Sequence, residues 1–295
     1  MKKLLFFLTA FTVYTSHAAT LYWVGGSGNW NDATKWSNSS GGSTCNCVPT
    51  NADDVVFDAN SFTGGGQTVT VNAQAYCKNM TWTSGLPSPT LAGSYQLDIY
   101  GSLTLSSTMN LTYTGSIYFK SNSGNSTITT TGKTLSTIYF DGTGGAWALQ
   151  DALTCNGSIY LNSGFLNTNG VNVQAYRLNA TGSGVKSLSL GNSTVTLSYG
   201  GSDAWWVSSS NTTFSAGTST IVLTGANATM DCSSLTFNNV TFQNTSSTSA
   251  RFYSANNSSF NNIIFAGGGS NIGGGTYSVN NLTLATSKSY SFSGT

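Results

Sequence analysis

Apolar and polar residues alternate in short runs along this chain, and one run returns at a fixed interval. Ile117-Tyr118-Phe119 recurs as Ile138-Tyr139-Phe140 and again as Ile159-Tyr160-Leu161, at intervals of 21 residues. A period of two places the Ile and the Phe or Leu on one face of a strand and the Tyr on the other. We therefore expect the three Ile residues to stack in a core and Tyr118, Tyr139 and Tyr160 to stack outside it.

A second run recurs near the C-terminus. Asn238-Asn239-Val240-Thr241-Phe242 is followed by similar sequences at 261–265 and 280–284, at intervals of 23 and 19 residues. Strand-like repeats of this length, without a helix signal, are typical of a β-solenoid, because one coil alone has too little apolar surface to fold. We predict an all-β chain in which residues 63–295 form a right-handed parallel β-helix of about 11 coils.

Two N-terminal segments differ from the repeats. Residues 20–62 are rich in aromatic residues and Asp, and we expect them to form a β-rich cap that covers the first coil. Residues 1–19 have the pattern of a secretory signal peptide, with Lys2 and Lys3 before an apolar run and a cleavage site after Ala18 or after Ala19. That run is shorter than the ~20 residues that span a bilayer. We therefore expect a secreted or cell-surface protein without a transmembrane segment.

The C-terminal end, residues 290–295, has the sequence of the start of another coil. We expect the solenoid to continue beyond it, as the front of a longer polypeptide. The alternative is that the solenoid ends here and pairs with a partner chain.

Charged residues are scarce, at 6% of the chain. Without Lys2 and Lys3, the 10 Lys and Arg residues fall to 8, against 9 acidic residues that are all Asp, and removal of His17 leaves no His. Nucleic-acid binding needs clustered Lys and Arg, so we exclude nucleic acid as a partner. Histidine-dependent catalysis is excluded for the mature chain as well.

The segment that follows the predicted signal peptide carries a family resemblance. The segment 22–30 (YWVGGSGNW), Trp36, the turn at 49–57 and the segment 77–82 together resemble the N-terminal part of large exported bacterial β-helix proteins. These are adhesin-like surface proteins of the type IX secretion route and, more loosely, autotransporter passengers. The resemblance implies a surface-displayed or secreted protein that is often adhesive.

One acidic cluster could hold a metal ion. Asp53, Asp54 and Asp58 would offer carboxylate oxygens, which suit Ca²⁺, and a structural Ca²⁺ is the only cofactor that we consider. The alternative is that these side chains accept hydrogen bonds from backbone N–H groups of a turn.

Five Cys residues are present, and export to an oxidising compartment favours a disulfide. We predict a bond between Cys47 and Cys77 that ties the cap to the first coil, with Cys45 as the alternative partner of Cys77. Cys155 and Cys232 are expected to be small buried residues.

Catalytic signals are sparse. The remaining Asp residues are isolated along the sequence, and Arg177 and Arg251 are the only Arg residues, so we predict that the protein is not an enzyme. Trp147, Trp205, Trp206 and the Tyr column at 118, 139 and 160 are candidates for a carbohydrate platform; the alternative is packing between coils. The 21-residue register also predicts that Lys120 lies beside Asp141, with Asn162 next in that column.

The function that these observations favour is a structural or adhesive module that presents a polar surface for attachment to cells or matrix, with a surface glycan or a protein as ligand. The alternative is a β-helix that binds or degrades polysaccharides.

Overall fold

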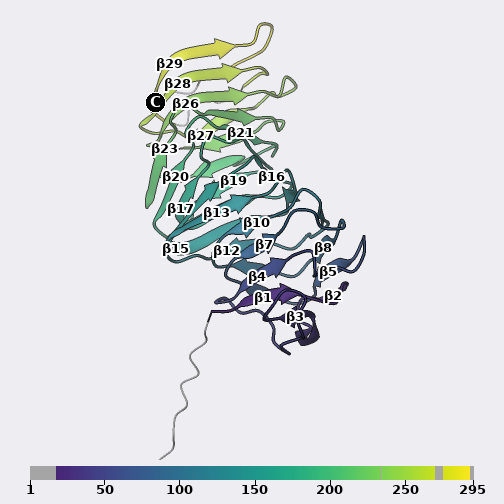
Figure 1. Ribbon diagram of the computed structural model, residues 1–295. Helices are drawn as coiled ribbons and strands as arrows, with labels where there is room; N and C mark the ends of the chain where they lie inside the picture. The colour runs from purple at the N-terminus through teal and green to yellow at the C-terminus, as the bar shows by residue number, and fades with distance from the viewer. Residues whose placement is uncertain (1–17, 233, 270–274, 293–295) are drawn as a thin grey trace, which may run out of the picture.

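Strands of successive coils lie one above another, from β1 at one end of the molecule to β29 at the other (Figure 1). The computed structural model describes residues 18–232, 234–269 and 275–292. Over these ranges the protein is a parallel β-solenoid of about 10 turns, close to the expected number. None of the helical segments described there is long and apolar enough to cross a membrane. The predicted signal peptide, except Ala18 and Ala19, lies outside the described residues.

Each turn contributes strands to three faces. The first face is formed by β1 (Thr20–Trp23), β4 (Asp54–Phe57), β7 (Met80–Trp82), β10 (Leu103–Thr104), β13 (Asn125–Thr129), β20 (Lys186–Ser189) and β23 (Thr212–Ser215). The third face is formed by β6 (Ala75–Cys77), β9 (Leu97–Ile99), β12 (Ile117–Phe119), β19 (Leu178–Ala180), β22 (Trp205–Val207), β25 (Thr229–Asp231) and β27 (Arg251–Ser254). Two long strands, β15 (Ile138–Leu149) and β17 (Ile159–Asn167), pair with strands of both faces and join them into one sheet.

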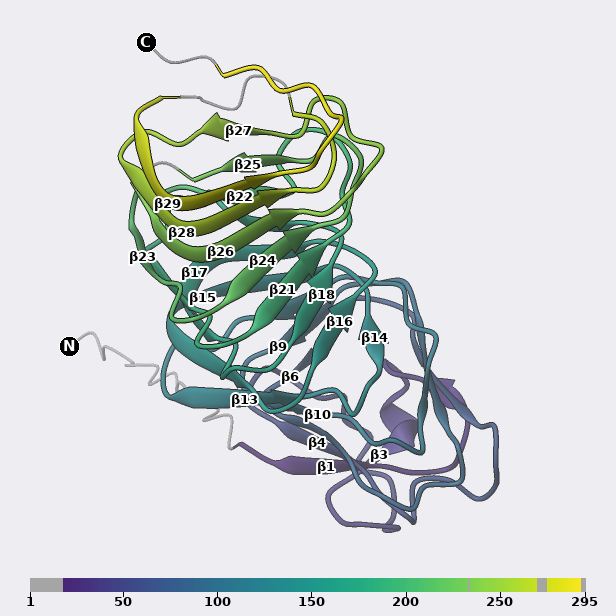
Figure 2. The ribbon, with the colours of Figure 1, turned by 90° about the horizontal axis from the view of Figure 1, so that it is seen from above.

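The second face comes between these two in each turn and is divided into two sheets. The N-terminal sheet contains β2 (Gly28–Asn29), β5 (Thr68–Val71), β8 (Thr90–Gly93) and β11 (Asn110–Leu111). The C-terminal sheet, seen stacked in Figure 2, contains β14 (Thr134–Leu135), β16 (Leu153–Cys155), β18 (Val173–Ala175), β21 (Thr194–Leu197), β24 (Thr220–Leu223), β26 (Thr236–Phe242), β28 (Ser258–Phe265) and β29 (Tyr277–Leu284).

The 21-residue register predicted from the sequence is confirmed. Ile117 pairs with Ile138 and Ile138 with Ile159, and their exposed fractions are 2%, 0% and 0%. The Tyr residues pair in the same register on the outer side of the third face and are half-buried. Alternation along each strand therefore decides which side chains enter the core.

The Asn-led repeats are also in register. Asn239 pairs with Asn262 and Asn262 with Asn281 on β26, β28 and β29. The Asn262 amide donates to Asn239 Oδ1 at 2.6 Å, and the Asn281 amide donates to Asn262 Oδ1 at 2.9 Å. The side-chain amide of Asn262 and that of Asn281 each donate a hydrogen bond to the Asn side-chain oxygen on the preceding coil. This ladder explains why the repeat has an amide at this position.

The N-terminal cap is itself part of the solenoid. β1 pairs in parallel with β4, and β3 (Trp36–Ser37) returns antiparallel along the other edge of β1. A short 3₁₀ helix, Ala33–Lys35, precedes that return. The ring centroids of Trp23 and Trp36 are 5.1 Å apart, and both side chains are fully buried. The antiparallel strand covers an edge that would otherwise expose unpaired backbone groups.

At the C-terminal end, Tyr290 forms an isolated parallel bridge with Gly269, in the register of a further coil. Residues 293–295, where the predicted coil start continues, lie outside the described part of the chain.

Candidate functional site

A hollow follows one corner of the solenoid, where the third face of each coil passes into the first face of the next. We call it the corner groove; its volume is about 640 Å³. It is formed by the equivalent corner segments of successive coils, and its lining residues are Ala18, Asn51, Ala52, Lys78, Asn79, Tyr100, Gly101, Ser102, Ser121, Asn122, Ser123, Gly124, Asn125 and Ser126.

Asn79 holds three neighbouring coils together at the base of this groove. Its amide donates to Asp54 Oδ1 at 2.7 Å, and its Oδ1 accepts from the backbone N–H of Ser102 at 2.6 Å. Gly101 makes the second contact possible, because a Cβ at this position would lie 2.2 Å from Asn79 Oδ1 and 2.9 Å from the Lys78 carbonyl oxygen. The corner therefore has a fixed backbone, on which the lining side chains are presented.

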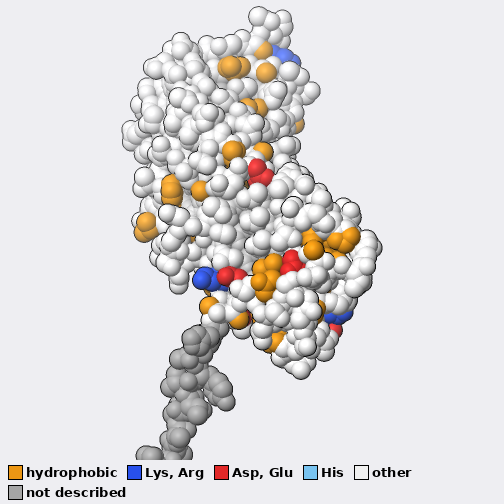
Figure 3. All heavy atoms as spheres, viewed as in Figure 1, with side chains coloured by type: hydrophobic (Ala, Val, Ile, Leu, Met, Phe, Trp, Pro, Cys, Tyr) orange, Lys and Arg blue, Asp and Glu red, His pale blue; other side chains and the backbone are white. Residues whose placement is uncertain are grey.

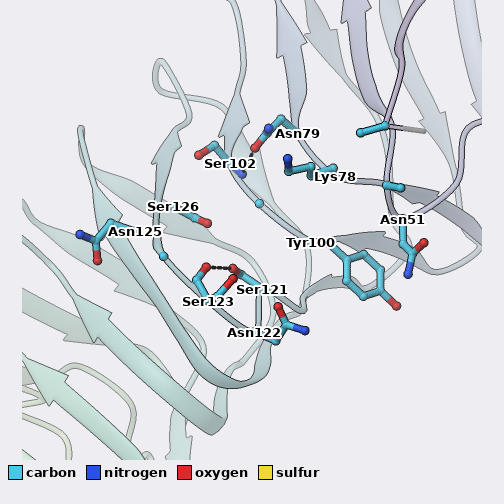
Figure 4. Close-up of a pocket in the computed structure, with 14 residues that line it drawn as sticks. Asn51, Lys78, Asn79, Tyr100, Ser102, Ser121, Asn122, Ser123, Asn125 and Ser126 are labelled. Atoms are coloured by element: carbon cyan, nitrogen blue, oxygen red, sulfur yellow. Dashed lines mark hydrogen bonds between the residues drawn. The ribbon is translucent and has the colours of Figure 1, made fainter. Parts of the chain in front are cut away.

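The lining combines one aromatic ring with amides and hydroxyls. Figure 4 shows the Tyr100 ring in the groove, between Asn51 on one side and Ser121 and Asn122 on the other. Tyr100 is half-buried, whereas Asn51 and Asn122 are exposed. Lys78 is the charged residue of the lining. Such a surface offers hydrogen bonds in several directions and one apolar ring face, the combination that recognises sugar hydroxyls and the C–H face of a sugar ring.

The wider surface is also poor in charge. Figure 3 shows a face that is largely white, the colour of the backbone and of uncharged polar side chains and Gly, with few red or blue side chains. Attraction of a ligand by long-range charge therefore contributes little here.

The predicted Tyr column lies on the third face. The ring centroids are 4.3 Å apart for Tyr118 and Tyr139 and 4.6 Å for Tyr139 and Tyr160, and both ring pairs are within 6° of parallel. Both faces of the Tyr139 ring are thus covered by its neighbours. Burial, and then the two adjacent phenols, raise the pKa of Tyr139. The column presents ring edges and hydroxyls rather than ring faces, so the geometry favours packing between coils over a stacking platform for sugars.

The other proposed platform residues are mostly internal. Trp147 and Trp205 have exposed fractions of 1% and 0%, so neither can meet a ligand, while Trp206 is half-buried on the outer side of β22. The strand register turns Trp205 inward because it pairs with Leu178 of the core.

A buried carboxylate continues the Tyr column on the preceding coil. Asp98 pairs with Tyr118 in the strand register, yet its exposed fraction is 1%. It accepts hydrogen bonds from the side chains of Gln74 at 3.1 Å and Gln96 at 2.6 Å and forms an ion pair with Lys120 at 2.9 Å. Three donors satisfy the charge, as a buried carboxylate requires.

Lys120 therefore forms its ion pair with Asp98, while Asp141, the neighbour predicted from the sequence, acts on it only through its charge. Partial burial lowers the pKa of Lys120, but the hydrogen bond and charge of Asp98 outweigh it and raise that pKa overall, with smaller contributions from Tyr100 and Asp141. The predicted column also fails at Asn162, because a register shift after Phe140 pairs Asp141 with Ser163.

The carboxylates of the three Asp residues considered for Ca²⁺ accept hydrogen bonds from other groups of the chain. Asp53 accepts from the backbone N–H groups of Ala19 and Thr50, and Asp54 from Asn79. Asp58 accepts from the N–H of Asn60 at 3.0 Å. Within the described ranges, no group of three or more His, Cys, Asp or Glu residues is placed to hold a metal ion. The bonds from Thr50 to Asp53 and from Asn60 to Asp58 are those of turns, as in the alternative interpretation, whereas the bond from Asn79 to Asp54 joins two coils.

The disulfide differs from the predicted one. Cys45 is bonded to Cys47, whereas Cys77 is a free, fully buried thiol on the inner side of β6. The predicted bridge to Cys77 is not formed in this structure, because Cys77 follows the alternation of its strand and faces the core, where it pairs in register with Ile99. Cys155 and Cys232 are buried free thiols, as expected.

The comparisons with known proteins add no relative: no protein-family model, curated protein or solved structure matches this chain.

The corner groove was not predicted from the sequence, although the sequence contains a pattern that points to it. Cys77, Ile99 and Phe119 occupy equivalent inward positions in the strand register, and the residue after each is Lys78, Tyr100 and Lys120. Aligning the coils on these inward positions brings the corner residues into one column.

Proposed function

We propose that the protein is an exported adhesive module, a rigid β-solenoid that attaches to cells or matrix through the corner groove. The observation that supports this most is the lining itself: Tyr100 lies among amides and hydroxyls on a backbone held by the Asn79 hydrogen bonds. Because the groove contains little charge, we propose an uncharged glycan as its ligand, in line with the carbohydrate-binding alternative. Several copies on one surface would strengthen a modest affinity by multivalency.

The groove does not support the second part of that alternative, the degradation of polysaccharides. Glycoside hydrolysis uses a pair of carboxyl groups, and the lining described above includes no Asp or Glu. We therefore propose binding without turnover.

The test is binding of the mature protein to an array of uncharged and acidic glycans and to matrix proteins, with Tyr100→Ala as the groove variant. Tyr95→Ala is the matched control, because the Tyr95 side chain is 56% exposed and lies outside the groove lining. We expect the groove variant to lose about tenfold in affinity, or ~1.4 kcal/mol, while the control binds normally. Added salt should change the affinity little.

Absence of binding to every glycan and matrix protein would contradict adhesion. Equal losses in the two variants would contradict the groove as the contact surface, and release of sugars from a bound polysaccharide would contradict binding without turnover.

A further inference from the structure

The first described residues of the chain make a contact that bears on how the protein is processed. The backbone nitrogen of Ala19 donates to Asp53 Oδ1 at 3.0 Å. Asp53 Oδ2 accepts from the backbone N–H of Thr50 at 2.9 Å and from its hydroxyl at 2.6 Å. The exposed fraction of Asp53 is 7%, so a largely buried carboxylate lies at the first coil of the solenoid, with Oδ1 directed at the Ala19 nitrogen.

The carbonyl oxygen of Ala19 is fixed as well, since it accepts from the backbone N–H of Asp54 at 2.8 Å. Ala19 is thus held on both sides by β4 and the turn before it, whereas Ala18 is exposed. The part of the chain that is hydrogen-bonded to the solenoid therefore begins at Ala19, immediately after the bond between these two residues.

This boundary coincides with one of the two cleavage positions that the sequence allows. Cleavage after Ala18 places Ala18 and Ser16, both small, at the last and third-last positions of the signal, whereas cleavage after Ala19 places His17 at the third-last position.

We propose that the signal peptide is removed between Ala18 and Ala19, and that the new α-ammonium of Ala19 forms an ion pair with the buried carboxylate of Asp53. A signal peptidase of the exporting cell would add water across this amide bond. The Ala18 carboxylate leaves with the signal segment, and the Ala19 nitrogen keeps its place and takes up a proton. The hydrogen bond from a neutral N–H to the carboxylate thereby becomes a hydrogen-bonded ion pair, in which both partners are charged.

Cleavage one residue later would leave a less favourable site. Removal of Ala19 would take away the donor of Asp53 Oδ1 and the acceptor of the Asp54 N–H. Burial of a carboxylate costs solvation free energy, which its hydrogen bonds offset. If one donor is lost, that part of the cost is no longer offset and the folded state is less stable. The structure therefore distinguishes between two positions that the sequence leaves open.

Removal of Ala18 would also change the corner groove, because Ala18 lines one end of it. The α-ammonium would then lie next to the position that Ala18 leaves, in contact with Asp53 and beside Asp54 on β4. The mature N-terminus thus adds a positive group to the edge of the groove.

The first experiment is export of the full chain by a bacterial host, followed by intact-mass measurement and N-terminal sequencing. We expect a mature protein that begins at Ala19. A mature protein that begins at Thr20, or at any other residue, would overturn the assignment. Neither measurement depends on adhesion, so a wrong cleavage position can be distinguished from a wrong proposed function.

The second experiment compares the protein that begins at Ala19 with one extended by Gly-Ser, which keeps the donor at Ala19 as an amide but removes its charge. We expect the extended protein to unfold about 2–4 °C lower at pH 7. Pairing with a carboxylate raises the folded-state pKa of the α-ammonium, so the difference should be full below the ordinary α-amino value of about 7.7–8.0 and disappear as the pH rises through the folded-state pKa. Equal melting temperatures at every pH would refute the ion pair.

Asp53→Asn provides the matched variant, and Asp58→Asn, which alters another turn carboxylate of the same region, is its control. The difference between the two N-terminal forms should vanish in Asp53→Asn and persist in Asp58→Asn. A difference that persists in both would assign the effect to the extension itself. If Asp53→Asn does not fold, the pH comparison of the two unsubstituted forms still tests the ion pair.

Discussion

The most direct test of the fold is truncation of Ile138 to Ala. Ile138 is fully buried between Ile117 and Ile159, its partners on the two adjacent coils. Truncation removes three methyl or methylene groups, which corresponds to about 2.4 kcal/mol of transfer free energy at ~0.8 kcal/mol each.

The cavity adds to that cost, because the surrounding coils cannot collapse into it. Backbone hydrogen bonds from Ile117 to Thr137 and from Ile138 to Ser158, both 3.0 Å, hold the coils at their spacing. We therefore expect about 3–5 kcal/mol, in the upper part of the range for this type of substitution.

Urea unfolding followed by far-UV circular dichroism measures the change, with hydrogen exchange to locate it, since a solenoid can open coil by coil. Tyr139→Phe is the matched control on the outer side of the same strand, and it should cost less than about 1 kcal/mol, because the stacked ring is retained. A cost for Ile138→Ala no larger than that of Tyr139→Phe would refute the inward column.

Three further predictions concern the corner and the thiols. Gly101→Ala should destabilise the protein by about 1–3 kcal/mol in thermal unfolding, because its Cβ would break the Asn79–Ser102 hydrogen bond, and a neutral result would show that this contact is dispensable. Lys120→Met should cost about 1–3 kcal/mol at pH 7, because it takes one of three donors away from the buried Asp98 carboxylate. The pKa of Lys120 is raised in the folded state, so the stabilisation is complete below the ordinary value of about 10.4 and is lost as the pH rises through the raised pKa; a difference that grows with alkaline pH would contradict the Asp98 pair. Burial raises the pKa of Cys155 to about 12, so Cys77, Cys155 and Cys232 should react with a thiol reagent only after unfolding, and peptide mapping should recover Cys45 linked to Cys47.

The repeat and its two-residue alternation were sufficient to predict a stacked all-β solenoid and the inward position of Ile117, Ile138 and Ile159. These features depend on local chemistry, because the side-chain direction on a strand and the pairing of equal coils follow from the sequence of each coil. The amide columns at Asn239, Asn262 and Asn281 follow from the same repetition.

The partners of individual side chains depend on how the coils are offset, which only the tertiary structure decides. A register shift after Phe140 pairs Asp141 with Ser163 and not with Asn162, and Lys120 forms its ion pair with Asp98 on the preceding coil. The inward turn of Cys77 leaves Cys45 to bond with Cys47. The corner groove arises from segments at residues 18, 51–52, 78–79, 100–102 and 121–126, which are distant in sequence and adjacent only because the coils stack. Strand alternation is a property of each segment, but a groove and an ion pair need the relative placement of several segments, and that placement is set by turns whose lengths vary from coil to coil.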